Sequence, residues 1–307
     1  MRTLDFAGSF VAVVTPFDAQ AGLDLAGFKR LVEMHVEAGT SGLVVLGSAG
    51  EAWTLTQQER ELLVHKAIEF ADGRIPIVAG VTRVSTEEAV SAAKKMQELG
   101  ADAVMAAAPP YVIPTQDGLY AHFEKIFRSV DIPVTLYNVP YRTGVNVEPE
   151  SIQRLFEDAG LAAYKEAGKN LPQLVETLEI TRGRLPILVC DAPAYGLIMP
   201  ALALGALGTA NISGNIAPKE MATLSRPWNS WTEVEEARRL YHLLLPLMKL
   251  VYEETNPVAL KGIMNLVGLP AGTVRPPLLP MNAEKLERAR TILEEKGLLA
   301  MITPSLA

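Results

Sequence analysis

Eight short apolar runs recur along the first two thirds of the chain, and this recurrence restricts the fold more than any other feature. The runs, rich in aliphatic and β-branched residues, are Ser9–Val14, Gly42–Leu46, Ile75–Ala79, Ala103–Ala107, Val134–Tyr137, Ala162–Lys165, Ile187–Cys190 and Gly208–Ile212. Helical segments lie between them, an alternation that is typical of parallel strands joined by right-handed crossovers. Eight such units predict an α/β fold, a closed (β/α)₈ TIM barrel.

The helical segments carry start and stop signals. A side chain that can accept a hydrogen bond stands ahead of three of them: Asp24, Thr56 and Ser85. A glycine stands just past the end of three: Gly39, Gly100 and Gly160. Both placements are those that cap helices, so we expect these segments to be helices.

After about Pro218 the alternation ends. Trp231–Tyr252, Pro257–Val267 and Asn282–Glu295 have the pattern of helices, separated by proline-rich stretches. We therefore expect residues 1–225 to form the barrel that carries the active site, and residues 226–307 to form a C-terminal helical appendage.

Composition limits the partners and the compartment. The chain has 28 Lys and Arg against 35 Asp and Glu, a net charge of −7, and no long basic run that could neutralise a nucleic-acid backbone. The single cysteine, Cys190, permits no intramolecular disulfide. Neither a signal-like start nor a run of membrane-spanning length is present, so we expect a cytoplasmic protein that binds neither nucleic acid nor membrane.

The histidines do not suggest a metal site. The four are His35, His65, His122 and His242, scattered through predicted helices without the spacing of paired ligands. We expect each to be a residue on the face of a helix, and no metal to be bound.

Lys165 ends the sixth apolar run, and in a (β/α)₈ barrel the active site lies at the carboxyl ends of the strands. Removal from water disfavours an ammonium group, and a neutral amine can attack a ketone. The alternative is a surface lysine at a strand end, or one that is paired with Glu166.

Tyr137 ends the fifth run, on the strand expected to lie beside that of Lys165. A phenol there could donate and accept protons while an amine adds to a carbonyl and water leaves. Tyrosines that merely pack in a core are common at such positions, which is the alternative.

Two further segments could bind anions. Gly47-Ser48-Ala49-Gly50 follows the second run, and its small residues would let backbone N–H groups face a carboxylate, with a hydroxyl from Ser48 beside them. Arg142 follows the Tyr137 strand, and its planar guanidinium suits a second carboxylate. A tight βα turn and an exposed loop arginine are the respective alternatives.

Three motifs in order resemble one family. Gly47-Ser48-Ala49-Gly50-Glu51, Tyr137-Asn138-Val139-Pro140 and Lys165-Glu166 resemble the dihydrodipicolinate synthase and N-acetylneuraminate lyase family of Schiff-base enzymes. The resemblance covers essentially the whole chain, since that family combines a barrel with C-terminal helices.

The resemblance implies a role for each motif. Lys165 would form a Schiff base with pyruvate or another 2-oxo acid, Tyr137 would transfer protons, and Gly47, Ser48, Ala49 and Gly50 would bind the carboxylate. Ser48 would connect Tyr137 to Tyr111 of a neighbouring subunit, so activity would require a homotetramer or a homodimer. No cofactor is expected, because a protonated imine is itself the electron sink of this lyase chemistry.

The second substrate is less constrained. Arg142 resembles the arginine with which the synthase branch binds the carboxylate of aspartate semialdehyde, and this favours condensation with pyruvate on the route to lysine. The alternative within the family is an aldolase or dehydratase acting on a 2-oxo-3-deoxy sugar acid or on 4-hydroxy-2-oxoglutarate. A non-catalytic 2-oxo-acid sensor is a third alternative, against which the retained Lys165, Tyr137 and Ser48 argue.

The chain also departs from the synthase pattern. Ala49 stands where threonine is common, Cys190 stands in a strand end that is usually Ser-Gly-Asp, and Tyr164 precedes the lysine where an aliphatic residue is usual. Pro110 replaces an aromatic residue at the expected interface. Gln57 and Arg60 occupy positions where lysine-inhibited relatives can carry histidines, so feedback inhibition by lysine is not expected.

Overall fold

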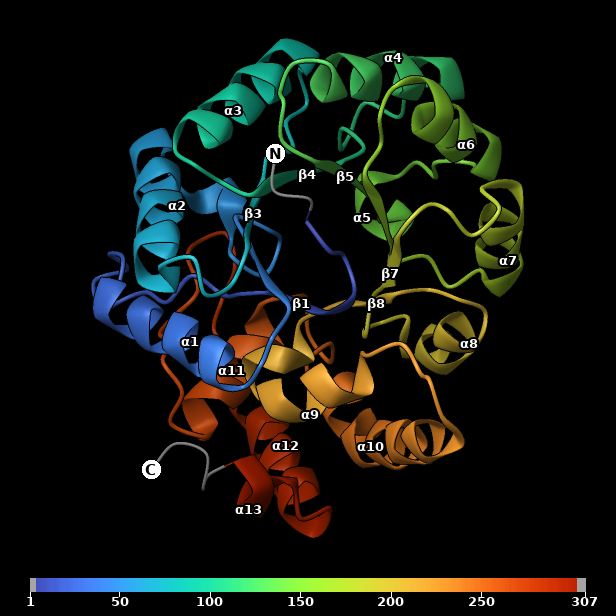
Figure 1. Cartoon of the computed structure of the whole chain (residues 1–307). Coiled ribbons are helices and arrows are strands. Elements are labelled where there is room, and N and C mark those ends of the chain that lie inside the picture. Colours follow the sequence, from blue (N-terminus) through green and yellow to red (C-terminus); the bar gives the residue numbers. More distant parts are fainter. Residues whose placement is uncertain (1–3, 303–307) are drawn as a thin grey trace.

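A computed structural model describes residues 4–302 of the chain. Its centre is a closed barrel of eight parallel strands in sequence order, in which β1 pairs with both β2 and β8 (Figure 1). The strands are β1 (Gly8–Ala12), β2 (Gly42–Val45), β3 (Ile77–Gly80), β4 (Ala103–Ala107), β5 (Val134–Asn138), β6 (Ala163–Glu166), β7 (Ile187–Val189) and β8 (Gly208–Asn211). The predicted (β/α)₈ barrel is confirmed.

Helices surround the barrel and cover the outer face of its strands (Figure 1). They are α1 (Leu25–Glu37), α2 (Gln57–Ala71), α3 (Thr86–Glu98), α4 (Gln116–Phe127), α6 (Pro149–Asp158), α7 (Leu171–Ile180), α8 (Ile198–Ala203) and α9 (Pro218–Leu224). Between β5 and α6 lies one extra turn, α5 (Pro140–Thr143). Because both faces of the sheet are covered, nearly every strand residue is buried, which explains why the strands have the sequence pattern of continuous apolar runs.

The predicted caps are present. The side chains of Asp24, Thr56 and Ser85 accept hydrogen bonds from the backbone of the first helical turns, and Thr56 forms a reciprocal capping box with Glu59. Gly39, Gly100 and Gly160 have φ of 72°, 93° and 84°. Only glycine adopts this left-handed conformation without strain, so these residues end the helices as expected.

Prolines explain where three strands begin. β3, β5 and β7 start directly after Pro76, Pro133 and Pro186. Proline has no N–H for the ladder, although its carbonyl still accepts a bond from the neighbouring strand, as Pro76 does from Leu43 at 2.9 Å. The third run was therefore predicted two residues early, at Ile75 instead of Ile77, and the other strand ends differ from expectation by at most two residues.

The C-terminal helices lie together on one side of the barrel, next to α9 (Figure 1). They are α10 (Trp231–Leu250), α11 (Val258–Leu266), α12 (Ala283–Glu295) and α13 (Leu298–Ile302). The first three were predicted, and the five-residue α13 was not. The amide of Phe17, on a barrel loop, donates to Ala271 at 3.3 Å. The proposed division at residue 225 stays a prediction, and its outer ends, residues 1–3 and 303–307, lie outside the described residues.

No helix between residues 4 and 302 combines the length and the apolar character that crossing a membrane requires.

Candidate active site

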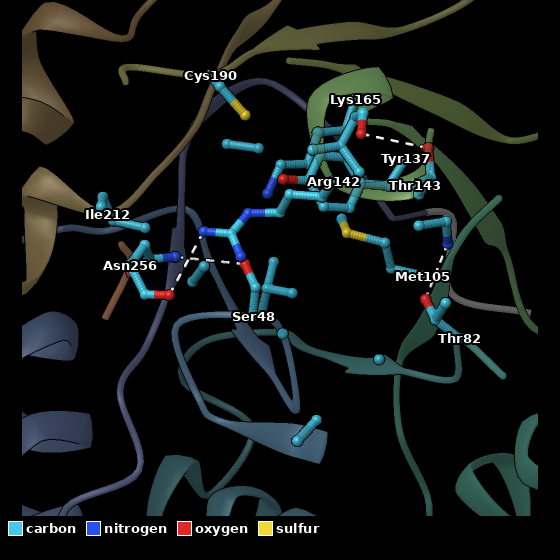
Figure 2. A pocket seen from close by; sticks show the side chains of 18 of the residues that line it. Ser48, Thr82, Met105, Tyr137, Arg142, Thr143, Lys165, Cys190, Ile212 and Asn256 are labelled. Atoms are coloured by element: carbon cyan, nitrogen blue, oxygen red, sulfur yellow. Dashed lines mark hydrogen bonds between the residues drawn. The ribbon is translucent and has the colours of Figure 1, made fainter. Parts of the chain in front are cut away.

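A cavity of about 300 Å³ opens at the carboxyl ends of the barrel strands. Its wall includes five of the residues singled out in the sequence: Gly47, Ser48, Tyr137, Arg142 and Lys165. Figure 2 shows Lys165, Tyr137 and Arg142 grouped on one side, with Ser48 and Asn256 facing them. The barrel therefore brings together these five residues, although Gly47 and Lys165 are 118 positions apart in the chain.

Lys165 and Tyr137 lie next to each other on the cavity wall. They are register partners on β6 and β5, and Nζ of Lys165 lies 4.1 Å from the centre of the Tyr137 ring. Only 5% of Lys165 is exposed, which excludes the reading of a surface lysine. Burial, with a contribution from Cys190, raises the pKa of the Tyr137 phenol well above its ordinary value. The phenol is therefore protonated at neutral pH and can donate a proton.

Glu166 does not pair with Lys165, because side chains alternate along a strand. Its carboxylate points away from the cavity and accepts hydrogen bonds from the Tyr164 hydroxyl, from the Gly168 amide and, at 3.3 Å, from Nδ2 of Asn138. Tyr164, unusual at this position, thus supplies a donor to a buried acid. Burial raises the pKa of Glu166, and these hydrogen bonds oppose the rise. The Asn138 contact links the ends of β5 and β6.

The loop after β2 offers free amides. Within residues 4–302 the backbone N–H groups of Ser48 and Ala49 donate no hydrogen bond, whereas that of Gly50 donates to Gly47 at 3.1 Å. Gly47 and Ser48 line the cavity, but Ala49 and Gly50 do not. The Ala49 methyl group is fully buried in the core, so the hydroxyl that threonine would carry is missing behind the cavity wall.

Arg142 extends across the cavity from α5. Its Nη2 donates to the backbone oxygen of Asn256 at 3.4 Å, while its Nε is buried without a hydrogen-bond partner among the described residues. Asn256 in turn donates from Nδ2 to Oγ of Ser48 at 3.3 Å (Figure 2). The guanidinium is thus held at the cavity with donors left over for an anion.

The end of β7 forms another part of the wall. Cys190 packs with Ala107, Val139 and Ala167 against Tyr137. Burial raises the pKa of its thiol to about 11, so it is not ionised at neutral pH and is a poor nucleophile. Next to it, the Asp191 carboxylate accepts bonds from the backbone of Ile212 and Ser213, which shapes the loop after β8.

Tyr111 does not line the cavity of the single chain. The residue is 92% exposed, and its φ of 78° is rare for a residue with a side chain. Ser48 forms no hydrogen bond with Tyr137 or with Tyr111 in the described part of the chain. The relay through Ser48 to a neighbouring subunit therefore stays a prediction.

Among the cavity residues that sequence reasoning missed, Tyr252 and Asn256 come from the C-terminal region. They follow α10, in the region expected to be an appendage. No local pattern marks them, because only the packing of the C-terminal segment over the strand ends brings them there. Thr82 and Arg83, after β3, were also missed and follow a strand end, which was the available signal.

The histidines lie in α1, α2, α4 and α10, as predicted. Oγ1 of Thr40 lies 3.1 Å from Nδ1 of His35, and Oγ1 of Thr86 lies 2.8 Å from Nδ1 of His122. Between residues 4 and 302 no group of three or more His, Cys, Asp or Glu side chains is arranged to hold a metal ion.

Comparison with known proteins identifies the family of the chain. The sequence model of the Dihydrodipicolinate synthetase family matches residues 5–296. A 4-hydroxy-tetrahydrodipicolinate synthase of Persephonella marina is 39% identical over 96% of this chain and 99% of its own length. Dihydrodipicolinate synthase from Thermotoga maritima has a TM-score of 0.90 and 36% identity, covering 95% of this chain and 99% of that one. A monomeric dihydrodipicolinate synthase variant is as similar, with a TM-score of 0.90 and 36% identity over 95% of this chain and 97% of its own. The chain described here belongs to the dihydrodipicolinate synthetase family.

Proposed function

We propose that the protein condenses pyruvate with aspartate semialdehyde through a Schiff base on Lys165, as a 4-hydroxy-tetrahydrodipicolinate synthase. The observation that carries this is the pairing of Lys165 with Tyr137 at the mouth of the barrel, with Arg142 in the same cavity. Family membership supports it, because relatives that match along nearly their whole length have this name. The protein is thus an enzyme, a lyase with class I aldolase chemistry.

The first half-reaction uses Lys165 and Tyr137. The lone pair of the Lys165 amine attacks C2 of pyruvate, forming an N–C bond, and the ketone oxygen takes a proton to give a carbinolamine. That hydroxyl leaves as water after a second proton transfer, and an iminium ion remains. The Tyr137 phenol, protonated and next to Nζ, is placed to supply these protons and to recover them.

The second half-reaction forms the new carbon–carbon bond. C3 of the iminium loses a proton, and the resulting enamine attacks the aldehyde carbon of the second substrate. The aldehyde oxygen takes a proton to become a hydroxyl, and the iminium forms again at C2. The amino group of that substrate then attacks C2, closes the ring and releases Lys165 as the free amine. The positively charged imine accepts the electron pair when C3 loses its proton and again when the amino group attacks C2, so these two steps ask for no further electron sink.

Two anion sites orient the substrates. The unpaired amides of Ser48 and Ala49 suit the carboxylate of pyruvate, and the Ser48 hydroxyl lies beside them. Arg142 suits the carboxylate of the aldehyde, because a guanidinium binds a carboxylate with two parallel hydrogen bonds. Gly47 and Gly50 contribute the tight turn that presents the amides.

We further propose that the active form is a homotetramer or a homodimer in which Tyr111 of one subunit reaches the cavity of another. Tyr111, Val112 and Ile113 are consecutive and exposed, an unusual run for a surface in contact with water only. Because one solved relative is described as a monomeric variant, the oligomeric state of this protein has to be measured. The cytoplasmic location stays a prediction.

Borohydride trapping tests the proposal. With pyruvate present, reduction should convert the imine to a stable secondary amine on Lys165, which peptide mass spectrometry locates. Lys165→Arg should abolish trapping, whereas Lys169→Arg, three residues beyond the end of β6, should retain it. An adduct on another lysine, or none with pyruvate, would overturn the assignment.

The second substrate needs its own assay. Wild-type protein and pyruvate should consume aspartate semialdehyde faster than a buffer control. Cleavage or dehydration of a 2-oxo-3-deoxy sugar acid in its place would favour the aldolase alternative, which the altered wall at Cys190 supports. Trapping on Lys165 would survive that result.

A further inference from the structure

Lys261 of α11 and Glu51 form a buried ion pair that the proposed reaction does not use. Nζ of Lys261 lies 2.6 Å from Oε1 of Glu51, and the two side chains are 2% and 1% exposed. Removing two charges from water is costly, and a buried pair is therefore weak evidence of stabilisation. Glu51 directly follows Gly50 of the carboxylate-binding loop, which suggests that the pair acts on that loop.

Both charges are held by further bonds, so the geometry is closely defined. Nζ of Lys261 donates to the backbone oxygen of Thr273 at 2.9 Å and lies 4.2 Å from the centre of the Phe17 ring. Oε2 of Glu51 accepts from the backbone N–H of Arg275 at 2.9 Å. Three parts of the chain, the loop after β1, the loop after β2 and the C-terminal region, therefore meet at this pair.

Arg275, in the C-terminal region, also contacts the loop after β1 and the chain that follows β2. Its guanidinium donates to the Glu59 carboxylate of α2 from Nη1 at 2.9 Å and from Nη2 at 2.6 Å. It also lies 4.2 Å from the centre of the Phe17 ring. The C-terminal segment thus contacts the chain that follows β2 at two points: at Glu51, through Lys261 and the Arg275 backbone, and at Glu59, through the Arg275 side chain.

The loop needs such support because its backbone is strained. Leu46 and Glu51, which bracket it, have φ of 61° and 50°, in the left-handed region that residues with a side chain rarely adopt. Such residues persist where their surroundings determine the conformation. Gly80 of β3 allows the loop to pass, since a Cβ there would lie 2.3 Å from the backbone oxygen of Leu46.

We propose that Lys261 is a positioning residue: through Glu51 it holds the Gly47–Gly50 loop in the conformation that presents the Ser48 and Ala49 amides to the carboxylate of the 2-oxo acid. This inference rests on the proposed function, because it assigns a consequence for pyruvate binding. Lys261 does not line the cavity. Its effect should therefore fall on pyruvate binding and leave the aldehyde site and the imine chemistry nearly unchanged.

Lys261→Met tests the inference, since methionine keeps the length of the side chain and removes its charge. The concentration of pyruvate that gives half-maximal borohydride trapping should rise about tenfold or more, a change of about 1.4 kcal/mol. The rate of trapping at saturating pyruvate and the KM for aspartate semialdehyde should stay within about threefold of the wild-type values. A general loss of structure would change all three quantities. Lys261→Arg should recover part of the affinity.

Lys285→Met is the matched control. Lys285 lies in α12 of the same C-terminal region and pairs with Glu254 at 3.0 Å, but 43% of its side chain is exposed. Its replacement should leave the half-saturating concentration of pyruvate unchanged. A rise equal to that of Lys261→Met would overturn the inference, because loss of any C-terminal ion pair would then have the same effect.

Lys261→Met alone leaves a buried carboxylate without its partner and could unfold the protein. A double variant separates the loss of the ion pair from such unfolding. Lys261→Met with Glu51→Gln removes both charges, and it should melt near the wild-type temperature yet keep the raised half-saturating concentration. If the wild type and the double variant are trapped at the same pyruvate concentration, the inference is wrong and the proposed function stands. If the wild type is not trapped at all, the proposed function fails and the inference fails with it.

Discussion

Nζ of Lys165 lies 4.1 Å from the centre of the Tyr137 ring, and the two residues are register partners on neighbouring strands. The register is set by the backbone ladder of β5 and β6, so neither side chain can move along the barrel without its strand. The Asn138–Glu166 contact, one residue further on each strand, reinforces this alignment. The pairing of amine and phenol is therefore a property of the barrel and not of a flexible loop.

Tyr137→Phe should slow imine formation and turnover by roughly 10²–10⁴-fold, the usual cost of losing a positioned proton-transfer group. The fold should be retained, because the ring that packs against Cys190 remains. The rate of borohydride trapping and the melting temperature measure the two effects separately. A near-normal trapping rate in a folded variant would reduce Tyr137 to a packing residue.

Arg142→Ala should spare pyruvate trapping and impair condensation with aspartate semialdehyde. Loss of a desolvated, charge-assisted contact commonly costs about 2–5 kcal/mol, which a comparison of kcat/KM resolves. Arg154→Ala is the control, since Arg154 is an exposed residue of α6 that pairs with Asp117. An aldehyde without a carboxylate should react equally with wild type and Arg142→Ala, and a defect there would contradict the assigned role.

Tyr111→Phe should reduce turnover in the oligomer although Tyr111 lies outside the cavity of its own chain. Mixing subunits that carry Lys165→Ala with subunits that carry Tyr111→Phe should restore part of the activity, because some cavities then receive Lys165 and Tyr111 intact. Native mass spectrometry of the mixture, with one variant isotopically labelled, confirms that mixed oligomers form. Wild-type turnover by Tyr111→Phe alone would count against a shared site.

Acid should destabilise the fold through its buried histidines. Burial lowers the pKa of His122 to about 4 and that of His35 to about 3. Both values lie below the ordinary value of about 6.5, so between that pH and the lowered pKa only the unfolded chain binds the proton. The free energy of unfolding is therefore highest above pH 6.5 and falls as the pH approaches 4.

The size of this effect can be measured on one residue. At about 1.4 kcal/mol for each pKa unit, His122 accounts for a loss of roughly 3 kcal/mol. Chemical denaturation of wild type and His122→Asn across this range gives the difference. If the two curves have the same slope, His122 does not contribute.

Much of the molecule could be read from local patterns. Eight apolar runs predicted eight strands, because a strand that is covered on both faces must be apolar throughout. Lys165, Tyr137 and the Gly47–Gly50 loop were found because reactive residues at strand ends are conspicuous in such a barrel. The largest error at a strand start, that of β3, came from Pro76, whose missing N–H delays the ladder.

Other parts of the site had no local signal. The free amides of Ser48 and Ala49 and the commitment of the Gly50 amide to Gly47 depend on loop geometry. Tyr164 looked like an anomaly in the sequence, and only the tertiary structure shows that its hydroxyl donates to Glu166 outside the cavity. The place of Asn256 in the cavity could not be predicted, because it depends on a helix that follows the barrel.

The sequence by itself determined the secondary structure, the order of the strands and the residues able to do Schiff-base chemistry, since these follow from short-range periodicity and side-chain type. The tertiary structure decided which of those residues share a cavity and what holds them there, including the contact of Asn256 with Arg142 and the pairing of Lys261 with Glu51 across 210 residues of chain. The physical reason is that these contacts depend on closure of the barrel and on packing of the C-terminal helices against its loops. Both are collective results of the whole core, which no short segment encodes.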